Sequence, residues 1–218
     1  MTIIKYPKLL IAGATGHSGK LLTKLALEQG YDVSVLVRDE QKIADIEHPN
    51  LHVFELGMDD VDKLAAMMAD GFDAILLTLG IYHRTLDTPL ADITENLLQA
   101  IPKNKRPQRI ICMSSLGAGE SVGQGTVLVR MMQRFSLKYV LLDKNKQEQL
   151  IKDSGIAWTL LRPSRLVHKK SSKPYKLWLG SDIPKKVAWK ISNLDSAKAM
   201  LAMLEDDETK NQALQCSY

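Results

Sequence analysis

The sequence predicts an α/β domain built on a single, doubly wound parallel sheet that is flanked by helices. Short apolar runs alternate along the chain with segments whose apolar residues recur at helical spacing, which is the pattern of a parallel sheet. One run, residues 72–79, is apolar almost throughout, as expected of a strand that is covered on both faces. The length of 218 residues suits one domain with a substantial core.

The first half of the chain supplies strands and helices in alternation. Apolar runs predict strands at residues 8–12, 32–37, 51–56 and 72–79. Helical spacing predicts helices at residues 17–29, 40–46, 60–69 and 88–100. Gly30 ends the first helix, because glycine readily adopts the backbone conformation that closes a helix. Pro89 stands at an early helical position, where no helical hydrogen bond needs its missing N–H.

The second half continues the alternation and then leaves it. Strands are predicted at 109–113 and 157–161, helices at 126–135 and 141–154, and a loop at 114–125. Beyond Ser164 we expect short strands at 175–179 and 186–191, a helix at 196–204 and a terminal strand at 213–218. Asn193 or Asp195 would cap that helix. Residues 164–218 are expected to form a small C-terminal, substrate-side portion of one domain, residues 1–218.

Composition excludes several classes of protein. The net charge is +4, and because no recognition motif accompanies the late lysines, we expect a solvated basic face and no nucleic-acid partner. Cys112 and Cys216 form neither a metal motif nor a disulfide framework, so no metal site is expected. The N-terminal residues are too polar for a signal peptide, and no apolar run approaches the roughly 18 residues of a membrane span. We therefore expect no membrane partner and a cytoplasmic protein.

A glycine-rich turn follows the first strand directly. Gly13, Gly16 and Gly19 stand at i, i+3 and i+6, and a helix begins within the same segment. Such a turn exposes backbone N–H groups and the positive end of a helix dipole, which suit a diphosphate. The residues expected to cradle a dinucleotide are Gly13, Ala14, Thr15, Gly16, His17, Ser18 and Gly19. The alternative is a glycine-rich turn without a ligand.

Arg38 bears on the kind of dinucleotide. It follows the second strand, where an acidic residue would accept a hydrogen bond from the ribose 2′-OH of NAD(H). An arginine there favours the 2′-phosphate of NADP(H), through charge-assisted hydrogen bonds. Asp39 is the competitor, because its carboxylate would favour NAD(H) if it pointed into the pocket. The sequence favours NADP(H) over NAD(H).

Polar residues at other strand ends are further candidates, because ligands of such sheets bind at the carboxyl ends of the strands. Ser114 and Ser115 follow the fifth strand, where a hydroxyl can hydrogen-bond a substrate carbonyl; alternatively, they cap backbone groups in a loop. Lys144 stands four residues before Glu148 on a predicted helix. The two either form a surface pair or leave Lys144 to reach the ribose of the nicotinamide half.

Five segments carry a resemblance to a known family. They are residues 13–19 (GATGHSG), 35–39 (VLVRD), 114–117 (SSLG), 154–163 (SGIAWTLLRP) and 191–195 (ISNLD). With these segments the chain resembles an atypical short-chain dehydrogenase/reductase, an NAD(P)-binding Rossmann protein. It is similar to the branch that contains biliverdin reductase B (flavin reductase) and the nitrogen-repression-regulator-like (NmrA-like) proteins. The resemblance runs from about residue 8 to residue 204.

The resemblance implies roles for individual residues. Ser115 would be catalytic and face the substrate side of the nicotinamide, and Lys144 would be catalytic on the active-site helix. Cofactor contacts beyond the glycine turn and Arg38 would come from Asp59, Thr78, Leu79, Gly80, Ser114 and Pro163, with Pro163 over the carboxamide. Residues 80–87 and 165–176 would form the walls around the substrate.

The chain departs from the family pattern at two places. The tyrosine of the family's Tyr-x-x-x-Lys motif would fall at Val140, and Tyr139 is one residue away. The aspartate that often meets the adenine would fall near Met58, and Asp59 is displaced by one. The usual proton donor is therefore absent.

The function we expect is hydride transfer between NADP(H) and a small conjugated acceptor, such as a flavin, a tetrapyrrole or a quinone-like compound. The expected partner is this small-molecule substrate, and the expected state is a monomer or a homodimer. Because the tyrosine is missing, a second hypothesis is a redox-sensing regulator that binds NAD(P) with little or no turnover. An epimerase or dehydratase ranks below both, because it would need the tyrosine and a larger C-terminal domain.

Overall fold

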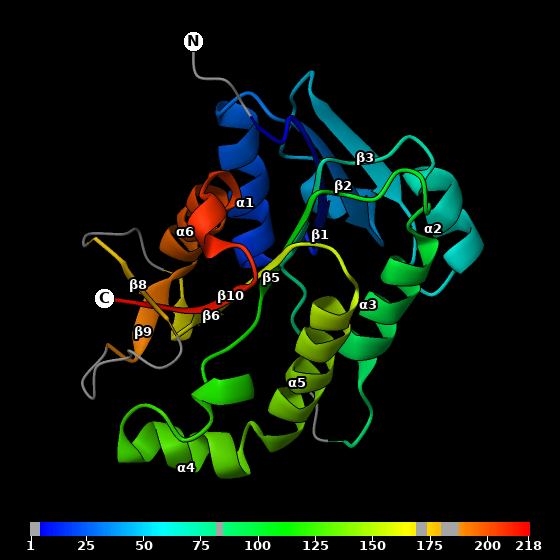
Figure 1. Cartoon of the computed structure of the whole chain (residues 1–218). Coiled ribbons are helices and arrows are strands. Elements are labelled where there is room, and N and C mark those ends of the chain that lie inside the picture. The colour runs from blue at the N-terminus through cyan, green and yellow to red at the C-terminus, as the bar shows by residue number, and fades with distance from the viewer. Residues whose placement is uncertain (1–4, 82–84, 169–173, 180–187) are drawn as a thin grey trace.

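The computed structural model describes residues 5–81, 85–168, 174–179 and 188–218 (Figure 1). Eight strands form one sheet in the order β3-β2-β1-β4-β5-β6-β10-β8. Their bounds are β1 (Lys8–Ala12), β2 (Asp32–Val37), β3 (Leu51–Glu55), β4 (Ala74–Leu77), β5 (Arg109–Met113), β6 (Trp158–Pro163), β8 (Lys176–Leu179) and β10 (Gln212–Ser217). All neighbours in this sheet are parallel except β10 and β8, which are antiparallel.

The order of the strands reverses around β1. This strand pairs with β2 on one side and with β4 on the other, so the chain winds outward from the centre in both directions. The predicted doubly wound parallel sheet is confirmed. A ligand site is expected at the switch point, outside the carboxyl ends of β1 and β4.

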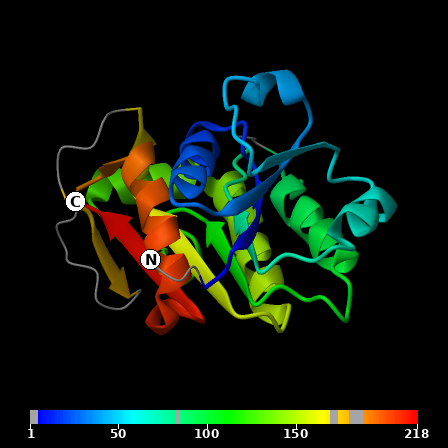
Figure 2. The same ribbon diagram turned by 90° about the horizontal axis from the view of Figure 1, so that it is seen from above.

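Helices cover both faces of the sheet, as Figures 1 and 2 show. Their bounds are α1 (His17–Glu28), α2 (Val61–Met68), α3 (Pro89–Ala100), α4 (Val127–Phe135), α5 (Lys138–Asp153) and α6 (Asn193–Glu205). Alternate residues of β1 enter two separate cores, because successive side chains of a strand point to opposite faces. Leu9 and Ile11 pack with residues of α1 and α6, and Leu10 and Ala12 pack with residues of α2, α3 and α5.

Three predicted helices differ from the structure by three residues or more, and one of them, predicted at 196–204, starts at Asn193. Residues 40–46 form only a short 3₁₀-helix, η1 (Glu40–Ile43). Ile43 is its one buried residue, so no apolar face stabilises a longer helix. The helix predicted at 141–154 starts three residues earlier, at Lys138, so Tyr139 and Val140 are both helical.

The predicted caps of α6 are wrong. Ser192 is the N-cap, and its hydroxyl accepts a hydrogen bond from the Asp195 N–H at 2.9 Å. The Asn193 side chain is held instead by Ser18 and His168. The Asp195 carboxylate accepts from the hydroxyl of Ser192. Both predicted caps therefore lie inside the first turn.

Residues 164–218 are integrated into the main sheet. They add β10 and β8 beyond β6, and α6 covers the face that α1 also covers. β6 continues through Pro163, where a turn was expected, because β10 pairs with it up to Cys216. A second, two-stranded sheet consists of β7 (Arg165–Val167), which the sequence did not predict, and β9 (Lys190–Ser192). The strand predicted at 186–191 lies partly outside the described residues.

The remaining described segments include α4, which stands at the lower edge of the molecule in Figure 1. Val127, Met131 and Phe135 recur on this helix every four residues and are exposed. Two further 3₁₀-helices are η2 (Gly119–Ser121) and η3 (Asp207–Thr209). Within the part of the chain that the structure describes, no helix has the length and apolar character needed to cross a membrane.

Candidate functional site

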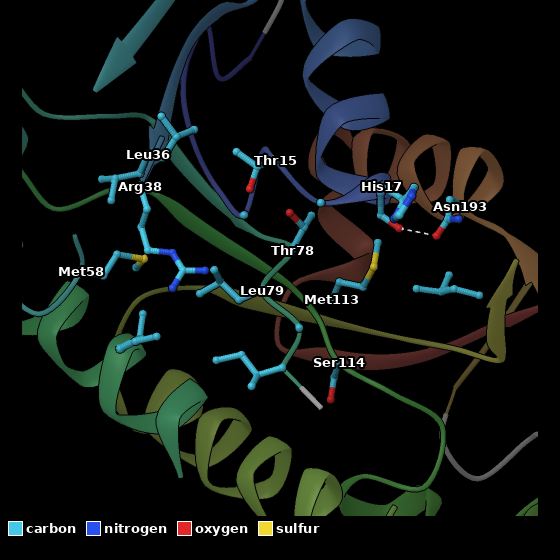
Figure 3. A pocket seen from close by; sticks show the side chains of 18 of the residues that line it. Thr15, His17, Leu36, Arg38, Met58, Thr78, Leu79, Met113, Ser114 and Asn193 are labelled. Atoms are coloured by element: carbon cyan, nitrogen blue, oxygen red, sulfur yellow. Dashed lines mark hydrogen bonds between the residues drawn. The ribbon is translucent and has the colours of Figure 1, made fainter. Parts of the chain in front are cut away.

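A cavity of about 610 Å³ lies outside the carboxyl ends of β1, β2, β4 and β5 (Figure 3). This is the switch point of the sheet, where a ligand site is expected. Twelve of the predicted site residues line it: Gly13, Thr15, Gly16, His17, Ser18, Arg38, Asp59, Thr78, Leu79, Gly80, Ser114 and Lys144. Segments far apart in the sequence therefore meet around one space of a size that suits a small-molecule ligand.

The glycine turn has the geometry that a phosphate cradle requires. Gly13 has a φ of 91°, which favours glycine, and its carbonyl accepts the Gly16 N–H at 3.0 Å. A Cβ at Gly19 would lie 2.1 Å from the Gly13 oxygen, so only glycine lets α1 pack this closely. Gly16 caps α1 without a side-chain hydrogen bond, and the first turn carries no acidic residue. The N-terminal N–H groups of α1 are thus available to an anion.

Arg38 extends from the end of β2 into the cavity (Figure 3). Among the described residues, its guanidinium has no hydrogen bond or ion pair. The Asp39 carboxylate, the competitor for the cofactor ribose, is occupied elsewhere. It accepts the Gln41 N–H at 3.1 Å and lies 3.6 Å from the Lys42 ammonium. Asp39 therefore does not line the cavity, and the charged side chains that do so beside the ends of β2 and β3 are Arg38 and Asp59.

Lys144 is buried and fully bonded to the protein. Its ammonium donates to the carbonyls of Leu79 and Met113 and to Oε1 of Gln147, each at 2.9 Å. It thereby joins the ends of β4 and β5 beneath the cavity. Burial lowers the pKa of Lys144. The alternative of a surface pair with Glu148 is wrong, because both side chains are buried and bind other partners.

Ser114 is joined to a buried ionic network. Its hydroxyl donates to the Glu148 carboxylate, and Arg162 donates to the same carboxylate at 3.0 and 2.6 Å. Arg162 also donates to Glu120 at 2.7 Å. Burial opposes the charge of Arg162, but the hydrogen bonds to Glu148 and Glu120 raise the pKa of its guanidinium. The hydroxyl proton of Ser114 is therefore used in its hydrogen bond to Glu148, whose carboxylate also accepts from Arg162.

Four of the predicted site residues do not line the cavity. Ala14 and Gly19 are buried beneath the glycine turn, and Pro163 is buried at the end of β6. The Ser115 hydroxyl lies 3.4 Å from the Leu116 carbonyl. Tyr139 does not line it either. Of the two predicted walls around the substrate, residues 82–84 and 169–173 lie outside the described residues.

Two further residues line the cavity. His168, after β7, belongs to the wall predicted at residues 165–176, and Asn193, at the start of α6, is a lining residue that the sequence did not indicate. The Ser18 hydroxyl donates to Asn193 Oδ1 at 2.8 Å, the bond drawn in Figure 3, and Asn193 Nδ2 lies 2.9 Å from His168 Nδ1. The rings of His168 and His17 are 3.7 Å apart. Asn193 stood within a family-like segment and His168 within the predicted wall, but no motif indicated that the two side chains would meet.

Comparisons with known proteins agree with this geometry. A family model described as NAD(P)H-binding matches residues 13–207. The uncharacterized protein YwnB of Bacillus subtilis is 27% identical over 216 residues, covering 94% of this chain and 95% of YwnB. An uncharacterized chloroplastic protein of Arabidopsis thaliana is 29% identical over 177 residues, covering 75% of this chain. The chain spans 60% of the length of that plant relative.

Solved structures share the fold. A short-chain dehydrogenase/reductase of Veillonella parvula in complex with NADP has a TM-score of 0.80 at 17% identity, covering 98% of this chain and 95% of the other. ChuY, an anaerobilin reductase of Escherichia coli O157:H7, has a TM-score of 0.78 at 18% identity, covering 96% of each chain. At 17% and 18% identity, the similarity to these two structures shows a shared fold alone.

Proposed function

Since the chain belongs to the family of NAD(P)H-binding proteins and has the fold of short-chain dehydrogenases/reductases, we propose that it is an NADP(H)-dependent oxidoreductase with a small conjugated acceptor. The observation that carries this proposal is the cavity at the switch point, with an open helix N-terminus in its wall and the unpaired cation of Arg38 at one end. When bound, the dihydronicotinamide supplies the hydride. The residues of the chain bind and orient the two reactants.

The cofactor fits the residues that are present. The diphosphate would lie against the N-terminal turn of α1, where Gly16 leaves room for close approach. The 2′-phosphate would meet Arg38, while Asp39 stays turned toward Gln41 and Lys42. The NADP complex of the Veillonella relative is consistent with this choice.

Replacing Arg38 tests the preference for NADP(H). Arg38→Glu should weaken NADP⁺ binding by about 10- to 100-fold, since a hydrogen bond to a charged group contributes about 1.5–3 kcal/mol. NAD⁺ binding should change much less. The measurement is titration calorimetry with both nucleotides. Lys103→Glu, an equal change of charge at an exposed residue outside the cavity, is the matched control. Equal affinity of the unaltered protein for both nucleotides contradicts the preference.

The proposed acceptor is a flavin, a tetrapyrrole or a quinone-like compound. The fold likeness to an anaerobilin reductase favours this class, because a reductase for a tetrapyrrole exists on the same fold. The experiment is oxidation of NADPH by the purified protein with FMN, biliverdin or menadione, followed at the absorbance of the reduced nicotinamide. Lack of turnover with every acceptor overturns the proposal.

A second candidate function is a redox sensor that binds NADP(H) with little or no turnover. Lys144 favours it, because all three N–H groups of its ammonium are bonded to the protein and the tyrosine position is Val140. Tight binding of NADPH without turnover, together with a protein partner that co-purifies, would support this function. The epimerase named for the relative YhfK of Bacillus subtilis, 24% identical over 94% of this chain, ranks lower because the tyrosine is missing.

A further inference from the structure

The proposed reduction needs a proton as well as a hydride, and the described residues at the cavity offer few donors. The N–H groups of Lys144 are bonded to Leu79, Met113 and Gln147. The hydroxyl proton of Ser114 is committed to Glu148. Among the described residues that line the cavity, His17 and His168 carry imidazole nitrogens that can hold a transferable proton.

We propose that His168 donates this proton to the acceptor, an inference that rests on the proposed function. The ring lines the cavity and is bonded to Asn193, which lies across the glycine turn from Arg38 (Figure 3). A dinucleotide whose 2′-phosphate meets Arg38 and whose diphosphate meets α1 extends its nicotinamide toward this side. His17 stands at the first residue of α1, beside the expected diphosphate. His168 is the ring of the two that is anchored through Nδ1.

Asn193, itself hydrogen-bonded to Ser18, can hydrogen-bond Nδ1 of His168 whether or not that nitrogen carries a proton. In the arrangement of the structure, the Ser18 hydroxyl donates to Asn193 Oδ1 and the amide nitrogen donates to His168 Nδ1, so a neutral ring carries its proton on Nε2. With the amide reversed, a protonated Nδ1 donates to Oδ1, and the amide nitrogen donates to the Ser18 oxygen. Both arrangements make two hydrogen bonds, so His168 can lose and regain a proton at little cost.

Among the described residues, the titratable and charged groups around His168 belong to α1, α6, β7 and β9. His17 on α1 faces it directly, with the two ring centroids 3.7 Å apart. The other charged groups on the adjoining elements are engaged elsewhere. They are Asp195 on α6, which accepts from Ser192 and Tyr218, and Arg165 on β7 and Lys190 on β9, which lie over the Trp189 ring.

The step balances as a two-electron reduction. The acceptor gains a hydride at one atom from the dihydronicotinamide, which is oxidised, and a proton at a second atom from Nε2 of protonated His168. The bond that breaks on the protein is Nε2–H, and the bond that forms is from the same proton to the acceptor. The ring is left with its proton on Nδ1, donating to Oδ1 of the reversed Asn193 amide, and Nε2 of the exposed ring then regains a proton from water.

Two acceptors that differ in their need for a proton test the role of His168. Menadione takes a hydride and a proton, whereas the cation methylene blue becomes neutral on taking a hydride alone. With saturating NADPH, His168→Gln should lower the rate with menadione on the order of 100-fold, the usual contribution of a general acid, and leave the rate with methylene blue unchanged.

The outcomes separate the two proposals. His48→Gln, on the surface outside the cavity, is the control and should keep both rates. Equal loss with both acceptors in His168→Gln, or loss of NADPH affinity with unchanged menadione turnover, overturns the role of His168. No turnover of the unaltered protein with any of FMN, biliverdin, menadione and methylene blue overturns the proposed function, and the role of His168 with it.

Nuclear magnetic resonance gives a readout that needs no cofactor. Imidazole ¹⁵N–¹H correlation spectra above neutral pH should show His168 with its proton on Nε2 and Nδ1 as acceptor. Asn193→Leu should remove this preference and give a mixture of both tautomers. A proton on Nδ1 in the unaltered protein, or an unchanged spectrum in Asn193→Leu, contradicts the anchoring of the ring by Asn193.

Discussion

Within the glycine turn, Gly19 tolerates substitution least. A Cβ there would lie 2.1 Å from the Gly13 oxygen and 2.6 Å from the Thr78 hydroxyl. Both neighbours are held in place, since Gly13 accepts the Gly16 N–H and the Thr78 hydroxyl donates to the Ala12 carbonyl. The turn can therefore accommodate a side chain only by separating α1 from the sheet.

Gly19→Ala should lower the free energy of unfolding by about 1–3 kcal/mol, the usual cost of overpacking, although alanine is the better helix former. Urea denaturation gives this difference. Gly80→Ala is the matched control, because a Cβ at Gly80 meets nothing within 4 Å and the residue lines the same cavity. Equal effects of the two substitutions would show that the close contact at Gly19 is not the cause.

Helix α5 places polar side chains in the interior through one helical face. Lys144, Gln147, Glu148 and Ile151 stand at i, i+3, i+4 and i+7 and are all buried. Each polar member has a partner, as buried polar groups require. Gln147 links Lys144 to the Thr94 hydroxyl of α3, and Glu148 links Ser114 to Arg162 of β6. The helix thus supports the floor of the cavity with fixed charges.

Glu148→Ala should destabilise the protein by about 3–5 kcal/mol, because it leaves the buried charge of Arg162 without its main partner. Glu120→Ala removes the other, 64% exposed carboxylate of Arg162 and should cost less than about 1 kcal/mol. Chemical denaturation of the two variants side by side makes the comparison. A similar small cost for both would mean that the interior pair contributes little to stability.

Across the molecule, the C-terminal residues complete the sheet begun by the N-terminal residues. β10 lies between β6 and β8, and its Leu214 and Cys216 belong to the same core as Leu9 and Ile11 of β1. α6 packs against α1 over this core. Residues 164–218 therefore share their buried surface with the rest of the domain, and we expect them to unfold together with it.

Two probes of unfolding test this expectation. Trp178 and Trp189 lie in residues 164–218, whereas Trp158 lies before them in β6, so the fluorescence of a Trp158→Phe variant reports on the C-terminal portion alone. Circular dichroism in the far ultraviolet reports on the helices of the whole chain. The two urea transitions should coincide. An earlier transition of the fluorescence would show that the C-terminal portion is a separate unit.

The fold was largely predictable because its signals are local. Apolar runs and helical spacing located six strands of the main sheet from β1 to β6 to within a few residues, and Gly13, Gly16 and Gly19 located the turn. The misplaced features depend on contacts between distant segments. β7 is a short strand that forms only where β9 pairs with it, and the cap of α6 moved to Ser192 because Ser18 and His168 hold Asn193.

The amino-acid sequence sufficed for the doubly wound sheet, the glycine turn and the arginine after β2, because each follows from neighbouring residues along the chain. Only the tertiary structure shows which side chains face one another. Only the folded chain turns Asp39 away from the cavity, bonds Lys144 to two strand ends, and joins His168 to Asn193 and Ser18. These contacts connect residues from separate helices and strands. The packing of those elements sets the distances between the side chains, and no local sequence pattern encodes that packing.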